Sequence, residues 1–172
     1  MASRGSGSLA RWQRQALQRM AASRRATLAF LPKLSETETR MPRTQDRWSV
    51  KDVLAHLMTC DEETVRRFRL IARGQADRIH WFESMADADR FNARSVAAAR
   101  RLGLPALRRR MARAHAAVLD SLRRLPPESL RDPAHAYPVT EWLPAPGWNH
   151  EREHLHEIKA WWRGTRSKHS RR

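Results

Sequence analysis

The sequence predicts an all-α fold in which four helices form a bundle. The chain of 172 residues is long enough for one domain with one hydrophobic core. Hydrophobic residues make up 41% of it and charged residues 30%, a composition that is typical of a folded globular protein. It contains only 6 glycines and 1 tyrosine, whereas Ala, Leu and Arg are abundant, and these side chains lose little rotamer freedom in a helix. We therefore expect helices and no substantial sheet.

The first helix is expected over about residues 9 to 31. Its apolar face carries Leu9, Trp12, Ala16, Met20 and Leu28, and Pro32 ends it. Residues 1 to 8 are rich in glycine and serine and are expected to form a flexible leader, whereas residues 164 to 172 are expected to form a basic disordered tail. The folded domain is therefore expected to cover residues 9 to 163.

The second helix is expected to begin after Ser49 and to run to about residue 73, where Gly74 ends it. Ser49 is a suitable N-cap, and Asp52 three residues later completes a capping-box-like pair. On a helical wheel, a polar line follows the edge of the apolar arc and consists of His56, Cys60, Glu63 and Arg67. Such a line indicates polar groups that enter a core between helices.

The third core helix follows a long crossover that carries a short helix at about residues 87 to 102. It is marked by apolar residues at spacings of three and four, with a histidine among them: Leu107, Met111, His115, Val118 and Leu122. From 126 to 148 the chain is rich in proline and cannot be helical throughout, so we expect a long ordered loop over one end of the bundle. Trp142 and Trp148 are expected to shape a substrate pocket there.

The last helix is expected from about Asn149 to residue 163, and it carries a pair of histidines with metal-ligand spacing. His150 and His154 are four residues apart, so their rings project from the same side of the helix about one turn apart. A solvated pair is the alternative, but both positions lie beside the apolar stripe. With His56 as the third donor, three imidazoles and open water positions suit Zn, Ni or Fe.

Three segments resemble motifs of the DinB-like superfamily. They are WSVKDVLAHL at 48–57, LRRLPPESL at 122–130, and NHEREHLHEI at 149–158 followed by Trp161 and Trp162. In order and spacing the resemblance covers roughly residues 9 to 163. It implies a four-helix bundle with a long crossover, and a divalent metal held by His56, His150 and His154. It also implies a range of activities, since such proteins include transferases and isomerases that use low-molecular-weight thiols, and resistance proteins, some of them cyclopropane hydrolases.

Four further residues are candidates for roles near the metal. Glu153 and Glu157 flank the histidine pair, and either carboxylate is suited to orient an imidazole or to act as a general base. Cys60 follows His56 by one turn and is a catalytic candidate, and Arg67 is a candidate for binding an anionic group of the substrate. The alternatives are exposed helix-face carboxylates, an inert packed thiol and an ordinary surface arginine.

The formal net charge of +16 favours polyanionic partners, so a basic nucleic-acid-binding protein is one alternative function. The arginines are scattered, however, and form no dense stripe. A single cysteine allows no internal disulfide and favours the cytoplasm, and no apolar segment approaches the ~20 residues of a membrane helix. The leading hypothesis is a metal-dependent transferase or hydrolase that acts on a small electrophilic substrate, as a monomer or homodimer. A natural-product self-resistance protein without metal catalysis is a further alternative.

Overall fold

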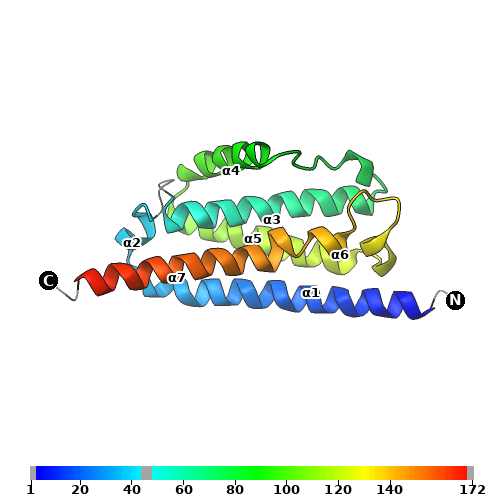
Figure 1. The fold of residues 1–172 in the computed structure, drawn as a ribbon, viewed down its shortest axis with the longest axis horizontal. Coiled ribbons are helices and arrows are strands. Elements are labelled where there is room, and N and C mark those ends of the chain that lie inside the picture. The colour runs from blue at the N-terminus through cyan, green and yellow to red at the C-terminus, as the bar shows by residue number, and fades with distance from the viewer. Residues whose placement is uncertain (1–2, 44–47, 170–172) are drawn as a thin grey trace.

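The computed structural model describes residues 3–43 and 48–169 of the chain. Its long helices α1 (Ser3–Phe30), α3 (Val50–Ala72), α5 (Leu104–Arg124) and α7 (His150–His169) run alongside one another (Figure 1). α3 packs most extensively against α5, while α1 contacts α5 and α7, and α7 also contacts α3. Within the described ranges there is no strand, only an isolated bridge between Pro42 and Ser49. The prediction of an all-α bundle is confirmed.

The crossover between α3 and α5 contains the helix α4 (Met85–Arg100), which lies along the outer side of α3 (Figure 1). Two polar contacts fasten its end to the start of α3. Arg100 Nε donates a hydrogen bond to Asp52 Oδ1 at 3.0 Å, and Lys51 Nζ donates one to the carbonyl oxygen of Arg100 at 2.8 Å. α4 is thereby held beside the turn of α3 that carries His56.

The ends of α3 are set by local chemistry, as the sequence predicts. The backbone N–H of Asp52 donates to Ser49 Oγ at 3.1 Å, and the backbone N–H of Ser49 donates to Asp52 Oδ2 at 2.9 Å, which completes a capping box. At the other end, Gly74 adopts a φ of 66°, the left-handed conformation that ends helices and favours glycine. His56 therefore has a well-defined position, one to two turns after a fixed helix start.

The core consists of two hydrophobic clusters separated by a layer of polar side chains. One cluster includes Leu54, Leu107 and Ile158, and the other includes Met20, Phe68 and Leu122, among other residues. Along each of the four long helices, a buried polar residue stands between the residues of the two clusters. These four residues are Arg24, Asp61, His115 and Glu151. We call them the polar layer.

Several predicted helix bounds are wrong at their outer ends. α1 begins at Ser3, not at residue 9, and α7 continues to His169, not to residue 163. Glycine lowers helix propensity but leaves the backbone N–H in place, so Gly5 and Gly7 do not stop a helix. Leu28, expected on the apolar face of α1, is 46% exposed. The buried face of α1 passes through Ser23, Arg24 and Thr27 instead.

The proline-rich segment before α7 is not the plain loop that the sequence predicts. It contains short helical turns over Pro127–Arg131, Val139–Trp142 (α6) and Ala145–Asn149. Proline is tolerated in the first turn of a helix, where its missing N–H has no partner to lose, and Pro127 occupies such a position. Among the described residues, no helix has the length and apolar character needed to cross a membrane.

Candidate metal centre

Three imidazoles from two helices converge between α3 and the start of α7. His56 Nε2 lies 2.6 Å from His150 Nε2, and His154 Nε2 lies 3.2 Å from the same atom. One nitrogen of each ring lies within 4.8 Å of the others. With metal–nitrogen bonds of about 2.0–2.1 Å, two ligand nitrogens lie about 2.9–3.4 Å apart. The 3.2 Å separation falls in this range and the 2.6 Å separation lies a few tenths of an ångström below it, so a modest rearrangement of the rings would let the donor set hold a divalent ion.

The surroundings lower the pKa values of two of these rings, His56 and His150. Burial, together with the neighbouring His150 and His154, lowers the pKa of His56 from 6.5 to about 3. Burial and His154 lower the pKa of His150 to about 4. Because a metal ligand must be deprotonated, rings that stay neutral well below pH 6.5 compete little with protons for the cation. Protonated His56 and His150 would repel each other, whereas their neutral rings present lone pairs to the same point.

A carboxylate orients the outermost of the three rings. Glu157 Oε2 lies 3.1 Å from His154 Nδ1, so a proton on Nδ1 is donated to Glu157 and the lone pair of Nε2 faces the other histidines. The guanidinium of Arg43 approaches the same Oε2 at 3.5 Å. Of the two glutamates named from the sequence, Glu157 therefore contacts a ring of the triad, whereas Glu153 lines a groove on the outer face of α7.

Cys60 lies beside the triad but outside it. Its Sγ is 3.8 Å from both ring nitrogens of His56. Burial, reinforced by the nearby Asp61 carboxylate, raises the pKa of the Cys60 thiol to about 12. The sulfur is therefore a protonated thiol near neutral pH, which is a weak nucleophile and a weak ligand.

An open pocket adjoins the triad. It has a volume of about 670 Å³ and is lined by residues of α4, α7 and the segment before α3: Arg43, Trp48, Asp89, Asn92, Ala93, His154, Glu157 and Trp161. Small-molecule sites usually occupy about 300–1,000 Å³. The groove on the outer face of α7 is slightly larger, about 720 Å³, but no ring of the triad lines it. We therefore take the pocket beside His154, which we call the triad pocket, as the candidate substrate site.

A profile of the DinB superfamily matches residues 19–158, which is most of the chain and includes all three histidines. The chain belongs to the DinB superfamily. Comparison with curated proteins and with solved structures gives no significant match. Membership agrees with the helical bundle of this DinB-superfamily protein and with a histidine group that could hold a metal ion.

The three residues named from the sequence for substrate binding lie elsewhere in this DinB-superfamily bundle. The guanidinium carbon of Arg67 is 4.5 Å from the centre of the Trp81 ring and 5.5 Å from that of Trp142, and its Nε donates to Glu63. Trp148 packs on Trp12, with ring centres 6.3 Å apart. Trp142 and Trp148 belong to the second hydrophobic cluster, and neither they nor Arg67 line the triad pocket.

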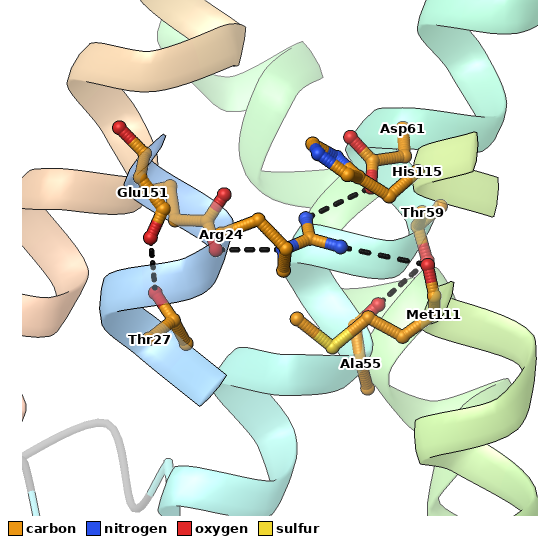
Figure 2. Close-up of polar contacts among 9 residues, drawn as sticks. Arg24, Thr27, Ala55, Thr59, Asp61, Met111, His115 and Glu151 are labelled. Carbon is orange, nitrogen blue, oxygen red and sulfur yellow. Dashed lines mark hydrogen bonds and ion pairs between the residues drawn. The ribbon is translucent and has the colours of Figure 1, made fainter. Parts of the chain in front are cut away.

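The polar layer lies directly beneath the triad and was missed by sequence reasoning. Arg24 lies between two carboxylates, donating from Nη2 to Asp61 Oδ2 at 2.9 Å and from Nε to Glu151 Oε1 at 2.7 Å (Figure 2). Burial lowers the pKa of Arg24, but Asp61 and Glu151 outweigh that effect and raise it overall. Since Glu151 follows His150 directly, the ion pairs join α1 and α3 to the turn of α7 that carries the triad.

His115 completes this layer from α5, beside Asp61 (Figure 2). Its Nδ1 is 3.5 Å from Asp61 Oδ2, and neither ring nitrogen makes a hydrogen bond within the described part of the chain. The expectation of a buried histidine on the apolar stripe is met, but the ring lacks the hydrogen bonds of a satisfied one. A weak signal for Arg24 existed, because it continues the spacing of Ala16 and Met20 along the buried face of α1.

Proposed function

We propose that the protein is a divalent-metal-dependent enzyme that acts as a transferase or hydrolase on a small electrophilic substrate. One observation carries the proposal, namely three imidazoles whose nitrogens lie within 4.8 Å of one another at the wall of an open pocket. Structural zinc sites generally use four protein ligands, whereas catalytic sites use three and keep a position open. A set of three histidines next to a pocket matches the second arrangement.

The candidate ions are Zn, Ni and Fe, since imidazole suits all three. Once bound, such an ion supplies Lewis acidity that lowers the pKa of water or of a thiol toward neutrality. A low-molecular-weight thiol is accordingly a candidate second substrate. Detoxification of a reactive natural product would use the same chemistry, with water or the thiol attacking the electrophilic carbon.

The residues of the chain have distinct tasks in this proposal. Glu157 holds the tautomer of His154, and its half-exposed carboxylate at the pocket wall is placed to accept a proton from the attacking nucleophile. Of the three catalytic candidates, Glu157 is thus the best supported. Glu153 does not line the triad pocket, and the Cys60 thiol is protonated near neutral pH. Trp48 and Trp161 supply apolar walls to the triad pocket.

Metal analysis of two matched variants tests the proposal. Wild-type protein loaded separately with Zn and Ni and desalted is expected to retain about one ion per chain by elemental mass spectrometry. His150→Ala removes the ring that contacts both other rings and is expected to abolish retention. His156→Ala, on the exposed face of the same helix, is expected to retain the ion. Equal retention by all three proteins, or none by the wild type, would refute the metal site.

Activity then tests the reaction class. The wild type is assayed with an epoxide and an activated alkyl halide, each with and without a low-molecular-weight thiol. We expect turnover that disappears on chelation and returns with the metal. Turnover that is unchanged in the His150→Ala variant would show that the triad does not carry the chemistry.

A further inference from the structure

The wall of the triad pocket includes a buried guanidinium, which belongs to Arg43. The side chain of Arg43 is only 4% exposed and lines the pocket. Its Nε makes no hydrogen bond within the described part of the chain, and Glu157 approaches only a terminal nitrogen, at 3.5 Å. Burial lowers the pKa of Arg43 despite Glu157. A buried guanidinium with an unused donor is costly unless a partner satisfies it.

The backbone holds Arg43 in a fixed position relative to the triad. Its N–H donates to the carbonyl oxygen of Trp48 at 3.0 Å, and the neighbouring Pro42 forms the bridge to Ser49, the N-cap of α3. The Trp48 ring in turn lies 5.2 Å from the ring of His56, centre to centre. The start of α3 therefore positions all three groups, namely the Arg43 backbone, the Trp48 ring and His56.

The remaining walls restrict the charge of a ligand. Asp89 and Glu157 both line the triad pocket, so two carboxylates lie on the walls that surround one guanidinium. A ligand with several negative charges would meet repulsion there, while a single anionic group is able to bind Arg43. Trp48, Trp161 and the amide of Asn92 offer surfaces for an apolar or aromatic body with few polar groups.

From this geometry we infer that the triad pocket takes a small organic monoanion with an apolar body, whose anionic group, such as a carboxylate, binds the guanidinium of Arg43. The inference deepens the proposed function, on which it rests for placing the reacting carbon of the substrate toward the histidines. Arg43 is a specificity-determining residue in this arrangement, since it selects charge and orientation. Nucleic acid, a polyanion too large for the pocket, is not the ligand of this site.

The test uses benzoate as the anionic probe and benzamide as its uncharged equivalent, titrated calorimetrically into metal-free protein so that benzoate cannot bind an ion. We expect the wild type to bind benzoate at least about tenfold more tightly than benzamide, the range of a charge-assisted hydrogen bond. Arg43→Met is expected to lose this preference. Arg40→Met is the matched control, because Arg40 is half-exposed, pairs with Glu36 and should leave the preference unchanged.

Arg43→Lys keeps the positive charge but lacks the planar guanidinium, so we expect an intermediate preference for benzoate. This variant also provides a second test if the Arg43→Met protein does not fold. The inference is overturned if the wild type shows no preference for benzoate, or if Arg43→Met retains it. Zinc retention is measured on the same proteins. Normal zinc retention without the benzoate preference would refute only the role of Arg43, whereas an Arg43-dependent preference without zinc retention would refute only the proposed metal enzyme.

Discussion

Removing Arg24 should destabilise the protein more than any other single arginine-to-methionine change among the ion pairs described. Within the described part of the chain, Arg24 is the one cation between two buried carboxylates, and the side chains of Arg24, Asp61 and Glu151 are 7%, 9% and 5% exposed. Arg24→Met keeps an unbranched apolar stem and removes the guanidinium. It leaves both carboxylates buried without their partner.

The magnitude follows from that burial. Breaking a buried ion pair from one side typically costs about 3–5 kcal/mol, because an uncompensated charge stays in the interior. Two carboxylates face one guanidinium, so these three side chains together carry one net negative charge. Glu151→Gln therefore removes an excess charge, keeps the pair of Arg24 with Asp61, and should cost only about 1 kcal/mol. The triple variant Arg24→Met, Asp61→Asn, Glu151→Gln should recover part of the loss.

Urea unfolding followed by tryptophan fluorescence measures these differences. With a slope of roughly 2 kcal/mol per molar urea, Arg24→Met should lower the midpoint by about 1.5–2.5 M at unchanged slope. Arg25→Met is the control, since Arg25 is the exposed neighbour on the same helix. If Arg24→Met lost no more stability than Arg25→Met, the reasoning about the polar layer would be wrong.

Three further predictions concern the carboxylate beside His154, the dependence of stability on pH, and the glycine that ends α3. Glu157→Gln should weaken zinc binding by about 10–100-fold in a chelator competition, because the orienting partner of His154 is weakened, whereas Glu153→Gln should not. The pKa values of His56 and His150 are lowered in the folded state, to about 3 and about 4. The unfolded chain therefore binds more protons below pH ~6.5, so metal-free protein should lose stability as pH falls from ~6.5 toward 4, by up to about 1.4 kcal/mol per pH unit for each histidine. His56→Gln should flatten that slope, and an unchanged slope would show that His56 does not titrate this way. Gly74→Ala should cost about 1 kcal/mol in urea unfolding because φ is 66°, although no atom lies within 4 Å of the added Cβ.

Local sequence signals predicted the helices that matter for the site. Ser49 and Asp52 form the capping box expected from their spacing, and Gly74 ends α3 in the expected conformation. The stripe on α5 is buried from Leu107 to Leu122. These features depend on neighbours within one or two turns, so the order of residues is sufficient to find them. Helix ends without a breaker, as at Ser3, carry no such signal.

The histidines were predictable to different degrees. The spacing of His150 and His154 predicts two rings on one side of a helix, and their convergence at 3.2 Å follows from helix geometry. That His56 joins them depends on the packing of α3 against α7, which the sequence indicated only through its resemblance to the DinB-like superfamily. The expectation that Trp142, Trp148 and Arg67 line the substrate pocket rested on no local signal of this kind, and none of the three lines the triad pocket.

The sequence by itself determined where the long helices lie, how α3 is capped, and which histidine pair shares a helix face, because each depends on contacts within a few residues. Only the tertiary structure placed two carboxylates around Arg24 and brought Arg43 to the wall of the triad pocket. The environment of a charged side chain is set by the partners that distant helices bring to it. Among 34 basic residues, no local pattern reveals which one will be buried between two carboxylates.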